Sequence, residues 1–119
     1  MEHSLFFIGL SFLTVHEMDA IRCKEWRIFP GLSLMGNLTG QWVFILAHIP
    51  LFFFVFYQLT HNSDHEGFIK GFEIFLVLHV GLHLLFLKHK KNEFKGMISW
   101  VLISGAGLFG LADLLIHLV

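Results

Sequence analysis

Four long apolar stretches, separated by short polar ones, dominate the order of residues along the chain. Each stretch is about 20 residues long, which is the length that an α-helix needs to cross the hydrocarbon core of a bilayer. We therefore expect helices over about residues 5–23, 41–59, 68–87 and 97–118. Short links join consecutive helices side by side and antiparallel. The pattern predicts an all-α fold in which residues 1–119 form a single domain, an integral membrane four-helix antiparallel transmembrane bundle.

The links differ in character. Residues 24–40 combine Trp26 with Pro30, Gly31 and Gly36, which favours a loop at the membrane interface, and residues 88–95 are basic. Residues 60–66 are polar, and we expect their charged side chains, Glu66 among them, to lie in a solvated loop. Small residues in the fourth helix, Ala106 and Gly110, predict a close approach to a neighbouring helix.

Composition supports a membrane protein and excludes several other classes. Of the 119 residues 55% are hydrophobic, far above the soluble norm, and the net charge of −1 argues against binding to nucleic acid. No glycine-rich phosphate loop is present, and the single Cys23 excludes an internal disulfide. The first apolar stretch has no basic start and no small-residue cleavage site after it, so we expect it to stay in the mature protein.

Lysines and arginines predict the orientation of the bundle. Those next to the first and third links are Arg22, Lys24, Arg27, Lys88, Lys90, Lys91 and Lys95, whereas the other side has only Lys70. Cytoplasmic loops of membrane proteins are enriched in Lys and Arg. We therefore expect the basic loops in the cytoplasm and both termini outside.

Titratable residues inside the apolar stretches are costly unless they are paired or bind an ion. Counted along the helices at about 1.5 Å per residue, histidines on three of them lie at one level in the cytoplasmic half of the membrane. Two of these, His79 and His83, lie one turn apart on one helix face, an arrangement that lets both bind one metal ion. The expected metal ligands are His16, Asp19, His48, His79 and His83.

Imidazole and carboxylate ligands suit zinc or iron. Two alternatives are a haem between His48 and His79 or His83, and a structural hydrogen-bond network without metal. A second group lies nearer the outer side: Glu73, Asp113, His117 and His3. Asp113 and His117 form either a local pair or, with the others, a relay or second ion site.

Together, these residues favour an integral membrane metalloprotein with a His-rich intramembrane metal site near the cytoplasmic face. If it is an enzyme, Glu17 or Asp19 is the expected catalytic proton acceptor, and the substrate is a lipid-like molecule that enters between helices. One alternative is a proton or metal-ion transporter, usually a homo-oligomer because four short helices enclose little space. Another is an accessory subunit whose polar residues only fix helix packing.

Several short motifs carry a resemblance over nearly the whole chain. They are His16-Glu17-Met18-Asp19-Ala20, Glu25-Trp26-Arg27, His48-x-Pro50, His79-x-x-x-His83, Asn92-Glu93-Phe94 and Ser99-Trp100-x-x-x-x-Gly105-Ala106-Gly107. Together they resemble a small uncharacterised bacterial membrane family, a domain of unknown function. The resemblance implies four transmembrane helices in the bacterial inner membrane.

Two looser resemblances involve the same residues. The chain is similar to small membrane proteins named for a His-x-x-Glu-Glu motif, with Asp19-Ala20 where Glu-Glu would stand. Its histidines resemble the three-His ligand set of intramembrane zinc hydrolases of the alkaline ceramidase and adiponectin receptor kind. Those proteins have seven helices, about twice as many as this chain.

Overall fold

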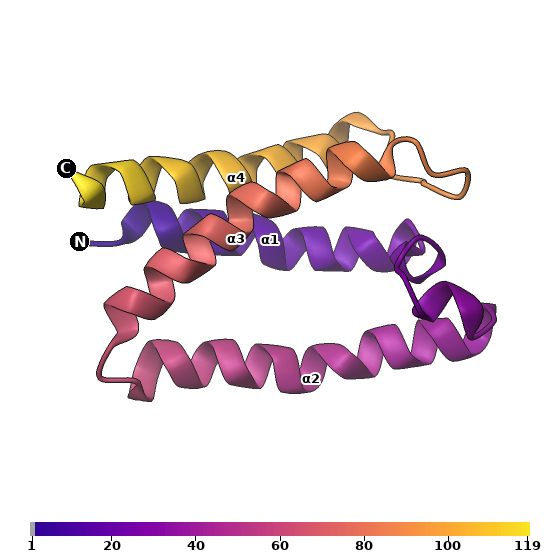
Figure 1. Ribbon diagram of the computed structural model, residues 1–119, viewed down its shortest axis with the longest axis horizontal. Coiled ribbons are helices and arrows are strands. Elements are labelled where there is room, and N and C mark those ends of the chain that lie inside the picture. Colours follow the sequence, from indigo (N-terminus) through magenta and orange to yellow (C-terminus); the bar gives the residue numbers. More distant parts are fainter. Residues whose placement is uncertain (1) are drawn as a thin grey trace.

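The computed structural model describes residues 2–119, which contain helices and no strand. The long helices are α1 (Ser4–Arg22), α2 (Asn37–His61), α3 (His65–Phe86) and α4 (Met97–Leu118), and two short 3₁₀ turns follow α1, η1 (Glu25–Arg27) and η2 (Leu32–Leu34). Each of the four long helices is long and apolar enough to cross a membrane. They run up and down beside one another (Figure 1), so the predicted all-α membrane bundle is confirmed.

The helix ends differ from the expected ones at both ends of α2 and at the start of α3. α2 begins at Asn37 and ends at His61, and α3 begins at His65 because Asp64 caps it: the Asp64 carboxylate accepts a hydrogen bond of 3.1 Å from the Gly67 amide. The link is therefore shorter than the sequence predicted. Glu66 lies in the first turn of α3, and not in a solvated loop.

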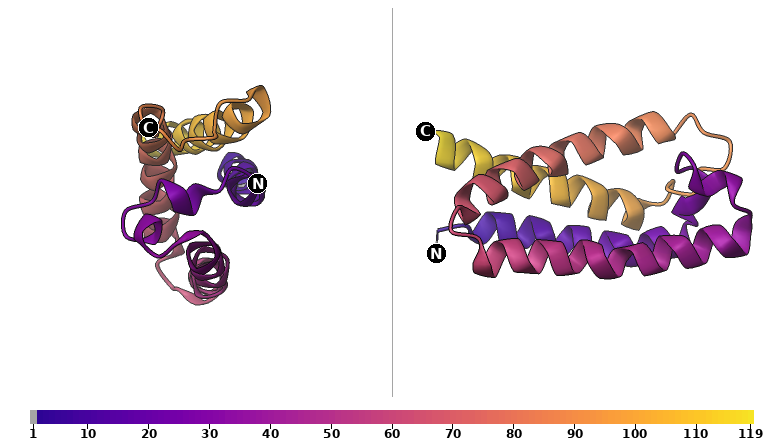
Figure 2. Two further views of the ribbon diagram at one scale, coloured as in Figure 1. Left: turned by 90° about the vertical axis from the view of Figure 1, so that its right-hand side faces the viewer. Right: turned by 60° about the horizontal axis from the view of Figure 1, so that its bottom comes forward.

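Helices α1, α3 and α4 form the packed part of the bundle, and α4 contacts both of the others (Figure 2). α1 approaches α4 closely: a Cβ atom added to Gly9 would lie 3.1 Å from the Ala106 carbonyl oxygen and 3.2 Å from the Gly110 amide nitrogen. Leu13, Leu76 and Ala106 make a small apolar core between these helices.

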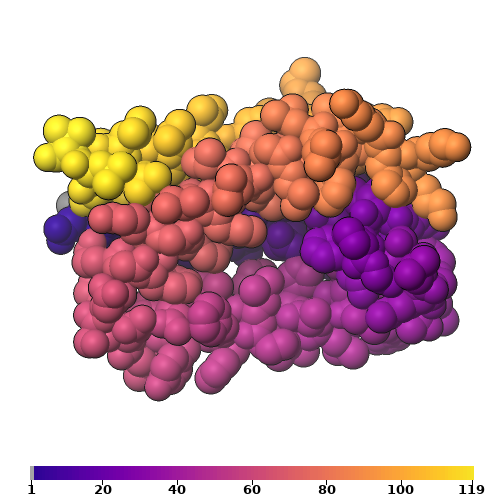
Figure 3. All heavy atoms as spheres, viewed as in Figure 1, coloured from indigo at the N-terminus to yellow at the C-terminus, as the bar shows by residue number. Residues whose placement is uncertain are grey.

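Helix α2 stands apart from this trio, and it is attached through α3 and through the turns η1 and η2. The surface is hollowed between α2 and α3, with α1 behind (Figure 3). Along α2 many large apolar side chains are exposed: Leu46, Ile49, Leu51, Phe53, Phe54, Phe56 and Tyr57. Such a surface fits a lipid bilayer rather than water.

The two ends of the bundle have different structures (Figure 1). Both termini and the link between α2 and α3 lie at one end, here called the terminal end. The loops 23–36 and 87–96 lie at the other, here called the loop end, and they fold over the helices there. The larger apolar core lies under these loops: Ala20, Cys23, Trp26, Ile28, Phe44, Phe94 and Ile103.

Candidate metal centre

Four buried side chains from three elements meet near the loop end. His16 comes from α1, Glu25 from η1, and His79 and His83 from α3, and we call them the loop-end cluster. One donor atom of each lies within 4.8 Å of one donor atom of every other. Their exposed fractions are 0% for His16, 6% for Glu25, 7% for His79 and 1% for His83. The cluster is thus closed to solvent and has the composition of a metal site.

The local structure explains why the rings converge. His79 and His83 lie one turn apart on α3, with ring centroids 4.6 Å apart, and the ring of His16 packs edge-on against both at 4.8 and 4.9 Å. Phe94, from the loop before α4, covers the group, with its ring 4.6 Å from that of His83 and 5.5 Å from that of His16.

Glu25 reaches the cluster because the chain reverses at the end of α1. Lys24 adopts a left-handed conformation with φ of 52°, which stops the helix and directs η1 back over the bundle. The carboxylate of Glu25 then lies beside α3, with Oε1 3.5 Å from Nε2 of His83. Helical spacing could not indicate this contact, because it depends on a turn outside any helix.

The ring nitrogens of the cluster have few partners. Five buried nitrogens form no hydrogen bond within the described residues: Nδ1 and Nε2 of His16, Nδ1 of His79, and Nδ1 and Nε2 of His83. A buried polar atom without a partner costs about 1–3 kcal/mol. The protein therefore holds three imidazoles together although most of their ring nitrogens have no hydrogen-bond partner among the described residues.

Asp19, an expected ligand and catalytic residue, lies in a different set of contacts. Its carboxylate accepts hydrogen bonds from Ser99 at 2.6 Å and from Arg22 at 2.8 Å, so that it joins α1 to α4. The Cys23 thiol lies 3.7 Å from the same carboxylate, and burial raises the pKa of this thiol. Asp19 thus has a full set of partners outside the loop-end cluster.

His48, another expected ligand, pairs with Glu17, the other expected catalytic residue. Its Nε2 lies 2.6 Å from Oε2 of Glu17, and its Nδ1 donates to the Phe44 carbonyl oxygen at 2.6 Å. Both side chains line a cavity of about 190 Å³ between α1 and α2. Of the five expected ligands, the structure therefore brings His16, His79 and His83 together and holds His48 and Asp19 elsewhere, while Glu25 was missed.

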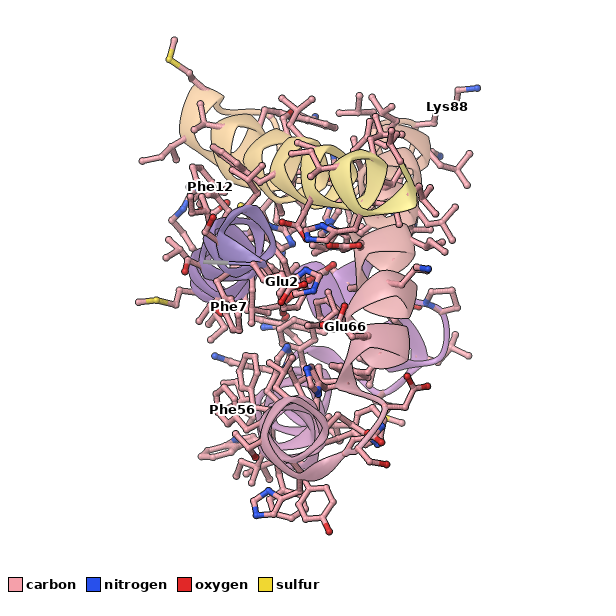
Figure 4. All side chains as sticks on the ribbon, turned by 90° about the vertical axis from the view of Figure 1, so that its left-hand side faces the viewer. Glu2, Phe7, Phe12, Phe56, Glu66 and Lys88 are labelled. Atoms are coloured by element: carbon pink, nitrogen blue, oxygen red, sulfur yellow. The ribbon has the colours of Figure 1, made fainter. Side chains whose placement is uncertain are left out.

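A second polar group, the terminal-end cluster, lies between α1, α3 and α4: His3, Glu66, Glu73, Asp113 and His117. The ring of His3 bridges two carboxylates, with Nδ1 2.8 Å from Asp113 and Nε2 2.8 Å from Glu66. It stacks on the ring of His117 at 4.2 Å. Figure 4 looks onto this end and shows nitrogen and oxygen atoms gathered between the helices, with mostly carbon on their outer faces.

Comparison with known proteins identifies no characterised relative. The sequence matches a family described as a family of unknown function (DUF6713) over residues 2–119. This match confirms the resemblance to an uncharacterised domain family. Neither a curated protein nor a solved structure matches the chain.

Proposed function

We propose a function for this chain, which belongs to the family of unknown function DUF6713, from the chemistry of its buried residues. It is an integral membrane metalloprotein that binds one divalent transition-metal ion near its loop end. The proposed ligands are the loop-end cluster: His16, Glu25, His79 and His83.

One observation carries this proposal: three buried imidazoles and a carboxylate face one another, while five of the ring nitrogens have no hydrogen-bond partner among residues 2–119. A purely structural network would pair these nitrogens with donors or acceptors. A metal ion takes one lone pair from each imidazole, so three of the ring nitrogens gain a partner, and Glu25 supplies a compensating negative charge.

The donor set favours zinc, with iron as the second choice. Three imidazole nitrogens and one carboxylate oxygen complete a tetrahedral zinc site, in which bonds of about 2.0–2.1 Å put the donors about 3.4 Å apart. The 3.5 Å between Glu25 and His83 already matches that spacing, and small side-chain rotations bring in the others. A haem between His48 and His79 or His83 is disfavoured, because both ring nitrogens of His48 already pair with Glu17 and the Phe44 carbonyl oxygen.

Four protein ligands and deep burial are typical of a structural ion, since catalytic zinc sites keep one position open for water. Bound there, the ion would join α1, η1 and α3. Helix α3 is distant in sequence from α1 and η1, and the ion would add a polar link to the two apolar cores that already join these elements.

We also propose an orientation. The basic residues surround the loop end, which favours the cytoplasmic side of a bacterial inner membrane for the loops and the metal, with both termini outside. The metal would then lie beneath the cytoplasmic interface, covered by Phe94 and the basic loop.

The cavities between α1 and α2 favour a second candidate function, a metal-dependent enzyme acting on a lipid-like molecule. A pocket of about 200 Å³ and the smaller one beside His48 have largely apolar walls, and both contain Glu17. An acyl chain fits such a space, and Glu17 would be the proton acceptor. Lipid analysis of purified protein tests it: we expect bound lipid in the wild type and less after Phe52→Trp, which enlarges a side chain that lines both pockets.

Metal analysis of the purified full-length protein tests the main proposal. We compare the wild type with a His79→Ala/His83→Ala variant and with a control, His61→Ala/His65→Ala, that removes two exposed histidines. The first variant should lose one equivalent of metal per chain, and the control should lose none. Equal metal content in the wild type and the His79→Ala/His83→Ala variant would refute the proposal. Because those alanines also leave space in the core, His79→Gln serves as a milder second variant.

A further inference from the structure

The terminal-end cluster contains a carboxylate whose burial needs an explanation. Glu73 is only 2% exposed, and its Oε1 forms no hydrogen bond within the described residues. The side chain lies beside the carboxylate of Asp113 and lines a pocket of about 300 Å³. Two buried carboxylates side by side repel each other unless a proton or a cation lies between them.

Positive charge nearby does not balance the carboxylates. His3 lies between Asp113 and Glu66, at 2.8 Å from each, and His117 lies 3.3 Å from Asp113, so neither imidazole forms an ion pair with Glu73 within residues 2–119. Lys70 lines the same pocket but is exposed, and it forms no ion pair among residues 2–119. The cluster has room and charge for one more cation.

The other donors of a metal site are present at the same place. One donor atom each from His3, Asp113 and His117 lie within 4.8 Å of one another. The Asp113 Oδ2 atom lies 2.8 Å from Nδ1 of His3 and 3.3 Å from Nδ1 of His117, which also lies 2.8 Å from the Asp113 carbonyl oxygen. An ion bound here would replace the proton on each of these ring nitrogens, while Nε2 of His3 keeps its contact with Glu66. Two imidazoles with a carboxylate and an open position are the ligand set of zinc sites that keep a place for water.

We propose that the terminal-end cluster is a second divalent-cation site, separate from the loop-end cluster, in which His3, Asp113 and His117 bind the ion. Glu73 supplies the fourth oxygen or the compensating charge. The site faces a pocket rather than a closed core, so its ion stays in contact with water and with small solutes. It therefore differs from the loop-end cluster in accessibility as well as in ligands.

Zinc titration tests this inference. The full-length protein in detergent is stripped with a chelator, titrated with Zn²⁺ alone, and analysed for bound zinc after desalting. The wild type should bind two equivalents per chain, whereas Asp113→Asn and His117→Gln should each bind one. Glu73→Gln keeps the shape of the side chain and should weaken the second equivalent by about tenfold or more.

Controls separate this site from the loop-end cluster and from loss of fold. Glu93→Gln removes an exposed acid at the loop end and should leave both equivalents bound. The zinc that remains in Asp113→Asn should disappear when His79→Ala/His83→Ala is added, which shows that the variant is folded. Two equivalents in Asp113→Asn, His117→Gln and Glu73→Gln alike, or a single equivalent in the wild type that only the His79→Ala/His83→Ala change removes, would overturn the second site. A single equivalent that only the Asp113 change removes would instead refute the loop-end site.

Discussion

The acidic residues on and just after α1 have three different environments, although they lie within nine positions of one another. Glu17 pairs with His48, Asp19 joins Ser99 and Arg22, and Glu25 faces His83. Among the three, only Glu25 lies near ring nitrogens that have no other partner. The charge of Glu25 is therefore the one available to a metal ion.

Replacing Glu25 should therefore affect metal binding where replacing Glu17 does not. Glu25→Gln removes the proposed carboxylate ligand and its compensating charge, so we expect the metal affinity to fall by about tenfold or more. Glu17→Gln is the matched control, since this residue contacts His48 and not the loop-end cluster, and its affinity should equal that of the wild type. Competition with a chromophoric chelator measures both. A greater loss of metal affinity in Glu17→Gln than in Glu25→Gln would show that Glu25 is not the carboxylate ligand.

Asp19 should matter for stability instead. Ser99→Ala removes a 2.6 Å hydrogen bond to a buried carboxylate, and such bonds contribute about 1.5–3 kcal/mol. We expect a lower melting temperature in detergent with unchanged metal content. Ser11→Ala is the control, because the Ser11 hydroxyl is exposed and bonds only within its own helix. Equal melting temperatures for both variants would contradict the role of this contact.

At the level of helices, the apolar stretches were enough to predict the four spans, and the spacing of His79 and His83 was enough to predict that they share a face. For His16 the sequence predicted only a depth in the membrane shared with other histidines, and not which of them it contacts. The depth of a residue in the membrane does not specify the direction in which its side chain points. His48 lies on α2, away from the packed helices α1, α3 and α4, and its ring pairs with Glu17 instead of joining the loop-end cluster. The position of Glu25 follows from the left-handed Lys24, which no periodic pattern encodes.

The close contact between α1 and α4 gives a prediction at this scale. Gly9→Ala places a methyl group 3.1 Å from a backbone oxygen of α4, so the helices must separate, and we expect a destabilisation of about 1–3 kcal/mol. Gly71→Ala is the control: it lies inside α3 with nothing within 4 Å of the added atom, and it should be neutral or slightly stabilising. Thermal unfolding in the same detergent compares the two. Equal stability would show that α1 and α4 do not pack this closely.

At the scale of the whole molecule, the chain has two polar clusters, one toward the loop end and one at the terminal end of an apolar bundle. Figure 1 shows these two ends. The cluster at the loop end is closed by Phe94, and the one at the terminal end faces a pocket. The sequence predicted both groups and their separation, because both follow from counting residues along helices. The sequence already placed His3 with the second group. It could not predict that Glu66 joins this group or that the ring of His3 bridges Asp113 and Glu66, since those contacts need the ends of three elements to meet.

Orientation is testable at this scale. The distribution of Lys and Arg predicts that both termini are outside the cytoplasm. Alkaline phosphatase fused after Val119 should therefore be active in bacterial cells, and a fusion within residues 88–95 should be inactive. An active fusion in the basic loop together with an inactive one at the carboxyl end would show that the orientation is opposite to the proposed one.

X-ray absorption at the zinc edge tests the central claim most directly. The Asp113→Asn variant, which lacks the carboxylate of the terminal-end cluster, is loaded with one equivalent of zinc. The loop-end cluster should give the signature of three imidazoles and one oxygen at about 2.0–2.1 Å. A spectrum with oxygen ligands alone, without imidazole scattering, would contradict a metal centre built from His16, Glu25, His79 and His83.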